Sequence, residues 1–253
     1  MKYIKANTLS CFSPPVMIAT FAIEIALAVY VTWRYKLTNI TKLAVSVLFF
    51  LAVFQLAEYN VCEGSFGIDS LGWSKLGYIA ITMLPPLGLH LATRIAGDKK
   101  TTLLAAAYGS AALFAMFFAF SGNGITSSAC LGNYVIFKTA PGSHWAYAAY
   151  YYGWLTVAVL YCANKIKQQL APNIIAALQA LMVGYLLFMV PTTLVNVIDP
   201  STIAGIPSIM CGFAVLLAIA LAGEVVPRYY QQPAITGLLA WGRKSSAHGK
   251  TTK

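Results

Sequence analysis

Residues 43–62 read LAVSVLFFLAVFQLAEYNVC, and this stretch decides the class of protein. Its residues are mostly apolar, and Glu58 is the only charged one. An α-helix of about 20 apolar residues is long enough to cross the hydrocarbon core of a bilayer. A membrane β-barrel would instead alternate apolar and polar residues over segments of about ten. We therefore predict a membrane-spanning helix here.

Further apolar runs of similar length lie on both sides of this stretch. Gly, Pro, Asp and Ser cluster between the runs, as expected for turns and loops. The sequence predicts an all-α fold, a polytopic membrane protein whose seven-transmembrane helix bundle covers residues 14–226. We expect an external segment at 1–13 and a basic cytoplasmic tail at 227–253. The other runs cover residues 14–33, 74–95, 101–120, 145–165, 173–197 and 208–225.

The composition supports this class. Hydrophobic residues make up 59% of the 253 residues and charged residues 9%, against about 25% charged residues in a soluble domain. A water-facing surface needs more charge than this chain contains, so a soluble globular protein is excluded. The lipid bilayer is therefore the first expected partner.

The distribution of basic residues predicts the orientation. Lys and Arg number 17 against 7 Asp and Glu, a formal net charge of +10. Basic residues collect in cytoplasmic loops. With seven helices, 13 of the 17 fall on the side of the C-terminus and 4 on the side of the N-terminus. We therefore predict an external N-terminus and a cytoplasmic C-terminus, and the excess positive charge needs no nucleic acid to explain it.

Polar residues at membrane depth are the candidate functional residues, because such residues are costly in hydrocarbon and usually face the bundle interior. We predict a ligand-binding pocket in the outer half of the bundle. An equally open interpretation is that these residues only form hydrogen bonds between helices. A further alternative is a secondary transporter or channel that uses Glu24 and Glu58. The predicted pocket residues are Gln55, Glu58, Tyr78, Tyr151, Trp154, Gln179 and Asn196.

Two of the five cysteines are expected to form a disulfide. Cys62 ends the second run on its outer side, and Cys130 lies in the long outer loop, where disulfides persist. We predict a Cys62–Cys130 bridge, with Cys11 as a competing partner because it is also external. In the same loop, residues 134–137 are expected to form a strand or hairpin arm over the outer face.

Enzyme motifs are absent. The sequence has no His cluster of the type that binds zinc, and no Ser/His/Asp set is visible. A retinal Schiff base needs a lysine in the last helix, and residues 208–225 contain none. We expect a protein that is not an enzyme, without a metal site, and the sequence assigns no cofactor.

One stretch carries a family resemblance. Residues 73–97 begin with Trp73 and Tyr78, continue with Pro85-Pro86, and end at Gly97. This order resembles the third helix of the N-terminal seven-helix input region of prokaryotic histidine kinases and diguanylate cyclases. Ala57-Glu58-Tyr59 and Ile198-Asp199-Pro200 are similar to the family's helix ends.

The resemblance implies a sensor in the cytoplasmic membrane of a prokaryote that passes a signal to an output domain. Only 28 residues follow residue 225, and they contain no kinase or cyclase. We therefore expect a receptor-like module that binds a small or lipophilic ligand and signals through a separate protein. The alternatives are a carrier, a channel, or a non-catalytic subunit of a membrane complex.

Overall fold

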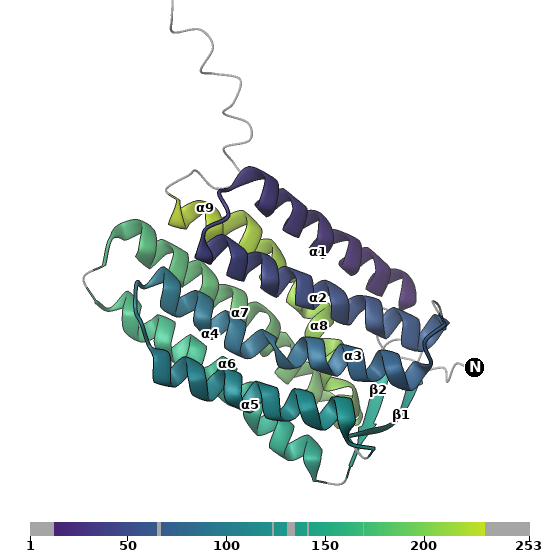
Figure 1. Cartoon of the computed structure of the whole chain (residues 1–253). Helices are drawn as coiled ribbons and strands as arrows, with labels where there is room; N and C mark the ends of the chain where they lie inside the picture. The colour runs from purple at the N-terminus through teal and green to yellow at the C-terminus, as the bar shows by residue number, and fades with distance from the viewer. Residues whose placement is uncertain are drawn as a thin grey trace, which may run out of the picture.

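The structure is a computed structural model that describes residues 13–64, 67–122, 124–130, 135–140, 142–168 and 170–230. Long antiparallel helices lie side by side, and a small hairpin covers one end of the bundle (Figure 1). The helices are α1 (Pro14–Arg34), α2 (Asn39–Glu63), α3 (Ser70–Thr82), α4 (Leu84–Ile95), α5 (Thr101–Phe120), α6 (Ser143–Ile166), α7 (Pro172–Ile198), α8 (Ile206–Ala220) and α9 (Val226–Tyr229). The strands are β1 (Ile125–Cys130) and β2 (Val135–Thr139).

Six of these helical segments are long and apolar enough to cross a membrane. They are Pro14–Arg34, Asn39–Glu63, Ser70–Ile95, Thr101–Phe120, Pro172–Ile198 and Ile206–Tyr229. The predicted multi-pass helical architecture is therefore confirmed at this level. The remaining long helix, α6, has 24 residues and is rich in tyrosine, which lowers its hydropathy. It packs against α4 and α7 within the bundle.

Helix ends follow local chemistry. The Thr38 hydroxyl accepts a hydrogen bond from the amide of Thr41 at the start of α2, and Asp69 accepts one from Gly72 at the start of α3, as N-cap residues do. Gly64 ends α2 in the left-handed conformation, with φ of 68°. Glycine adopts this conformation without the strain that a Cβ atom introduces.

The predicted third helix is broken in two. Pro85 and Pro86 cannot donate backbone hydrogen bonds to the preceding turn, so α3 ends at Thr82 and α4 begins at Leu84. The carbonyl oxygen of Thr82 lacks a donor at Pro86 and accepts instead from the Tyr150 hydroxyl, at 2.6 Å. A buried tyrosine therefore holds this break in place.

The last membrane helix is longer than predicted. Helix α8 passes into a π-helical segment, Leu221–Val225, and then into α9, so that Ile206–Tyr229 forms one continuous rod. A short 3-10 helix, Pro200–Gly205, precedes it. The rod contacts α1, α2 and α7, and therefore lies inside the bundle (Figure 1).

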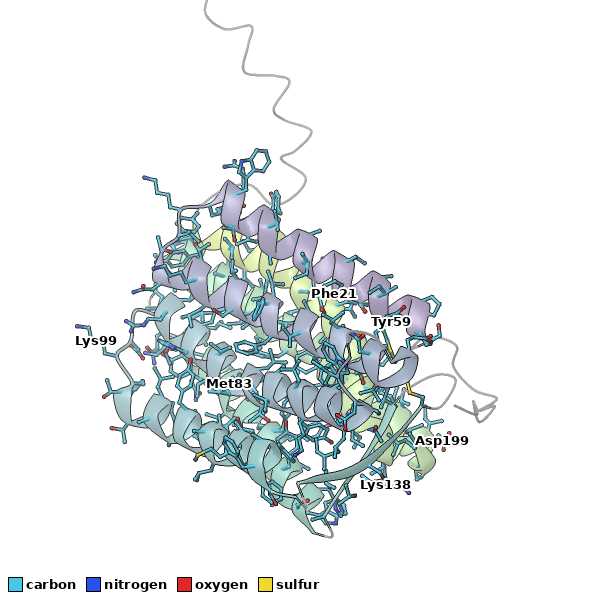
Figure 2. All side chains as sticks on the ribbon, turned by 45° about the vertical axis from the view of Figure 1, so that its right-hand side comes forward. Phe21, Tyr59, Met83, Lys99, Lys138 and Asp199 are labelled. Carbon is cyan, nitrogen blue, oxygen red and sulfur yellow. A yellow bond between two sulfur atoms is a disulfide. The ribbon has the colours of Figure 1, made fainter. Side chains whose placement is uncertain are left out.

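The hairpin closes the end of the bundle opposite to α9. Strands β1 and β2 pair antiparallel, with Cys130 opposite Val135. Cys130 is bonded to Cys62 at the end of α2, with the two Cα atoms 5.6 Å apart, and the bond is visible near Tyr59 in Figure 2. This is the pairing expected from the sequence. Residues 135–137 of the predicted strand lie in β2, whereas Tyr134, Cys11 and the segment 1–12 lie outside the described residues.

Candidate functional site

Two carboxyl groups lie buried where α1, α2 and α8 meet. Glu24 in α1 is 0% exposed and Glu58 in α2 is 1% exposed. The two side chains interact electrostatically. The Glu58 carboxyl is hydrogen-bonded to Ser208 near the start of α8. This arrangement joins three helices through polar groups inside an otherwise apolar bundle.

Tyr78 and Cys211 complete this cluster. Both are buried, and both interact electrostatically with Glu58. Cys211 lies three residues after Ser208, so the two share one face of α8. We call the set Glu24, Glu58, Tyr78, Ser208 and Cys211 the carboxyl site.

The carboxyl site lacks partners for several of its polar atoms. Both carboxyl oxygens of Glu24 and Oε1 of Glu58 have no hydrogen-bond partner in the structure. The same holds for Nε2 of Gln55, which lies one turn before Glu58 on the same face of α2. Most buried polar groups in proteins are satisfied, so a group of unsatisfied atoms in one place indicates a function or a missing partner.

Within the described ranges, neither ion pair involves these carboxyl groups. Among the described residues, the ion pairs are Lys165–Asp98 and Arg228–Glu224. Both lie at the end of the bundle opposite to the hairpin. No group of three or more His, Cys, Asp and Glu residues that could hold a metal ion is found in the described part of the chain.

The hairpin contacts the carboxyl site directly. The amide of Val135 in β2 donates a hydrogen bond to the Ser208 hydroxyl, at 3.2 Å. Cys62, the disulfide partner of Cys130, lies one turn beyond Glu58 on α2. Phe137 of β2 packs edge-on against the ring of Tyr78, with the ring centres 5.2 Å apart. The hairpin therefore covers the site at this end of the bundle.

An aromatic cluster lies beside the carboxyl site. The rings of Tyr78, Phe114, Phe118, Tyr147 and Tyr150 contact one another between α3, α5 and α6. The Tyr147 hydroxyl is hydrogen-bonded to the Thr82 hydroxyl at 3.0 Å. Such contacts add to the burial of the rings. Together with the Tyr150 hydroxyl, they attach the α3–α4 break to α5 and α6.

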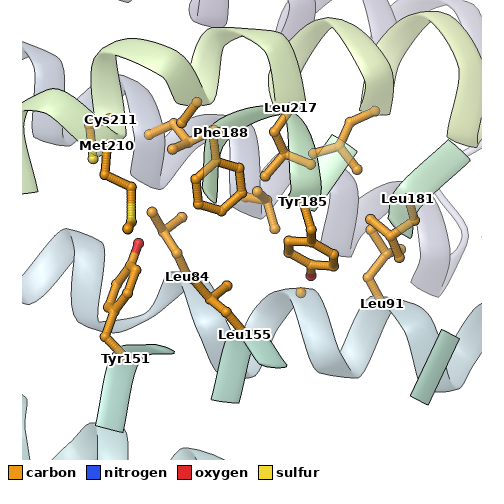
Figure 3. A pocket seen from close by; sticks show the side chains of 15 residues that line it. Leu84, Leu91, Tyr151, Leu155, Leu181, Tyr185, Phe188, Met210, Cys211 and Leu217 are labelled. Atoms are coloured by element: carbon orange, nitrogen blue, oxygen red, sulfur yellow. The ribbon is translucent and has the colours of Figure 1, made fainter. Parts of the chain in front are cut away.

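A small cavity lies deeper in the bundle, among α2, α4, α6, α7 and α8 (Figure 3). Its volume is about 20 Å³, which is room for about one water molecule. Apolar side chains form most of its wall, and Tyr151, Tyr185 and Cys211 contribute the polar atoms. The Tyr185 hydroxyl has no hydrogen-bond partner. Cys211 thus borders both the cavity and the carboxyl site.

Four of the seven predicted pocket residues lie in this region. Gln55, Glu58 and Tyr78 are buried at or next to the carboxyl site, and Tyr151 lines the cavity. The aromatic cluster packs beside these residues, and the cavity that Tyr151 lines has a volume of about 20 Å³.

The other three predicted residues lie elsewhere. Trp154 faces α5 and donates a hydrogen bond to Ser110 at 3.0 Å. Gln179 is exposed on the surface of α7. Asn196 accepts a hydrogen bond from Thr202 at 2.7 Å and so stabilises the turn after α7. Helical spacing alone does not predict these neighbours, because it does not say which element each face of a helix meets.

The sequence interpretation missed Ser208 and Cys211 as site residues. Their spacing of three residues at the start of the last apolar run was the available signal, because it places two polarisable side chains on one face of the helix.

The opposite end of the rod is also anchored. The Tyr230 hydroxyl contacts the Thr38 and Thr41 hydroxyls at the start of α2, at 2.5 and 3.0 Å. The Tyr230 ring stacks on Tyr35, with the ring centres 5.6 Å apart. The rod therefore connects the carboxyl site to the end of the bundle where α1 and α2 are joined.

No protein family, no curated protein and no solved structure matches this chain. The resemblance of residues 73–97 to a sensor input region therefore stays a prediction.

Proposed function

We propose that this chain is a membrane sensor module that detects a small ligand at the carboxyl site and signals through a separate protein at its cytoplasmic face. Three buried carboxyl oxygens without partners, next to a rod that reaches the other end of the bundle, carry this proposal. Ionisable residues inside a membrane commonly have a functional role, because burying them in hydrocarbon is costly.

In this proposal α6 is a seventh span, the N-terminus is external, and the membrane is the cytoplasmic membrane of a prokaryote. The charge distribution supports the orientation. Of the Lys and Arg residues that the structure describes, nine lie in or next to the turns on the α9 side and two on the hairpin side. Lys99 and Lys138 mark the two ends in Figure 2. This asymmetry follows the positive-inside rule.

The rod provides the route for a signal. The route starts at Ser208 in the rod and passes through the π-helical segment Leu221–Val225. It ends at Tyr230, which contacts α2. Single π-helical turns occur frequently at functional sites. A small shift of α8 at the carboxyl site would therefore change the packing at the cytoplasmic end, where a partner protein would bind.

Hydrogen–deuterium exchange tests the coupling in the full chain in lipid nanodiscs. Glu58→Gln removes the site carboxyl, and Glu63→Gln changes an exposed carboxyl five residues further along α2 as the matched control. We expect Glu58→Gln, and not Glu63→Gln, to change exchange in residues 35–42 and 221–230. A change confined to the hairpin end would contradict the sensor function.

A secondary transporter or channel is the second candidate, because Glu24 and Glu58 are buried carboxyl groups on different helices. A carrier needs an aqueous path, and both carboxyl groups are sealed in this conformation. Flux in liposomes that depends on pH and is lost in both Glu24→Gln and Glu58→Gln would favour transport. A structural subunit of a membrane complex would show neither flux nor coupling.

A further inference from the structure

The carboxyl site consists mainly of hydrogen-bond acceptors. Glu24 presents two unpartnered oxygens and Glu58 one, and all three are shielded from solvent. The unpartnered Nε2 of Gln55, on the same face of α2, is a hydrogen-bond donor and carries no positive charge. A carboxylate in a medium of low dielectric constant needs a proton or a cation to offset its charge. The site is therefore built for a positively charged ligand.

The described ionisable side chains that face Glu58 provide no positive charge to offset its carboxylate. Helix α1 contributes Glu24, α3 contributes Tyr78, and α8 contributes Cys211. None of these side chains is basic. On the hairpin, Lys138 is exposed and Cys130 is in the disulfide.

Other ionisable groups on neighbouring elements are engaged elsewhere, and Lys75 of α3 donates a hydrogen bond to the carbonyl oxygen of Ala119. In α4, His90 is hydrogen-bonded to Tyr108 and accepts from Arg94. Glu224 of the π-helical segment pairs with Arg228 of α9. These side chains therefore do not neutralise the carboxyl site.

A proton fits the site better than a metal ion. Metal cations such as Ca²⁺ take six to eight oxygen ligands, whereas three carboxyl oxygens are free here. The nearby cavity is mostly apolar and holds about 20 Å³. A proton needs one acceptor oxygen and no cavity.

We infer that Glu24 and Glu58 form a proton-binding site loaded from the external water, so that external acidity is the signal of the proposed sensor. This inference rests on the proposed function. In the loading step, a hydronium ion transfers its proton to a carboxylate oxygen, an O–H bond forms, and a water molecule is released. Ser208 joins the Glu58 carboxyl to the hairpin backbone, so Glu58 is the member of the pair that is tied to the hairpin end of the bundle.

Infrared difference spectroscopy on the full chain in nanodiscs tests the inference. The probe is the proton itself, titrated from acidic to alkaline buffer, and the readout is the C=O stretching band of protonated carboxyl groups. We expect a band that disappears as the pH rises, that is lost or reduced in Glu24→Gln and Glu58→Gln, and that persists in Glu63→Gln. Ser208→Ala should shift the band without removing it, and this variant serves if either glutamine variant fails to fold.

A band that stays constant over the whole titration would overturn the inference, because the carboxyl groups would then be fixed hydrogen-bond donors. Displacement of the band by sodium at constant pH would also overturn it, in favour of a metal ion. The exchange experiment above separates the two claims. A titrating band without coupling to residues 221–230 would support the proton-binding site and contradict the sensor function. Coupling without a titrating band would support the sensor function and contradict the proton-binding site.

Discussion

At the scale of single residues, this bundle depends on a few contacts that helical spacing does not reveal. Gly88 in α4 is one of them. A Cβ atom at this position would lie 1.8 Å from the Tyr185 hydroxyl oxygen, so only glycine fits beneath that ring. Tyr185 is buried, and its hydroxyl has no hydrogen-bond partner. Close packing therefore explains the glycine at this position. Its backbone is helical and does not have a positive φ.

We expect Gly88→Ala to lower the free energy of unfolding by about 1–3 kcal/mol, the usual cost of overpacking. Tyr185→Phe alone should be neutral or stabilising, because it removes a buried hydroxyl without a partner. The double variant should recover most of the loss. Gly109→Ala in α5, where a Cβ meets no atom within 4 Å, is the control and should cost nothing. Thermal unfolding in detergent measures all four, and an equally large loss without recovery in the double variant would contradict the contact.

At the scale of elements, the hairpin is held by one covalent bond and a few hydrogen bonds. Cys62 and Cys130 are separated by 68 residues in the sequence. Ser70 in α3 and Ser128 in β1 add a hydrogen bond of 2.8 Å between their hydroxyls. The disulfide therefore closes a long segment of chain that contains α3, α4 and α5.

Replacing both bridge cysteines with serine should destabilise the protein by about 2–4 kcal/mol, because the unfolded chain regains the freedom of the closed loop. The measurement is chemical unfolding of the oxidised wild type and the Cys62→Ser/Cys130→Ser variant. The reduced wild type is the matched control and should behave as the variant does. Equal stability of oxidised and reduced protein would show that the hairpin is held by packing alone.

The turn between α4 and α5 is attached to α6 by Asp98. Its carboxylate contacts the Lys165 ammonium at 2.8 Å and accepts a hydrogen bond from the Tyr161 hydroxyl at 2.7 Å. The Lys165 ammonium and then the Tyr161 hydroxyl hold the pKa of Asp98 below its usual range. A group whose pKa is lower in the folded state stabilises the fold above its unfolded pKa. That contribution is lost as the pH falls through the folded pKa.

We therefore expect Asp98→Asn to lower the free energy of unfolding by about 1 kcal/mol or less at neutral pH, since the pair is partly exposed. At a pH below the folded pKa of Asp98, the variant and the wild type should be equally stable. Thermal unfolding over a pH series measures the difference. A difference that persists in strong acid would assign the effect to packing and not to charge.

At the scale of the whole molecule, the apolar runs predicted most of the fold. Runs of about 20 apolar residues leave few alternatives in a membrane, because every backbone polar group must be satisfied within the helix. The sequence did not predict that α3 ends at Thr82 or that α8 continues to Tyr229 through a π-helical segment. The end of α3 follows from Pro85 and Pro86, whereas the continuation of α8 depends on neighbouring helices, which no local pattern describes.

The candidate site was predicted in part for the same reason. Gln55 and Glu58 were found because polar residues are rare in such a run, and the structure buries both. Three other polar residues were predicted in the same way but lie elsewhere. Trp154 is hydrogen-bonded to Ser110, Gln179 is exposed, and Asn196 is hydrogen-bonded to Thr202. Which face of a helix meets the core depends on the rotation of all its neighbours.

The orientation of the chain is a prediction at this scale. We expect a reporter fused after Lys100, and one fused at the C-terminus, to be cytoplasmic, and one in the loop before α6 to be external. The reason is the concentration of Lys and Arg at the α9 end. A reporter that reads external after Lys100 would invert the topology and place the carboxyl site on the cytoplasmic side.

The central claim is that the carboxyl site and the end of the bundle at α9 change together. Distances between spin labels at Lys36 and Lys167, both exposed at that end, test it most directly in the full chain in nanodiscs. The claim predicts that Glu58→Gln shifts the distribution of this distance, and that Glu63→Gln leaves it as in the wild type. Identical distributions in all three proteins would contradict the claim.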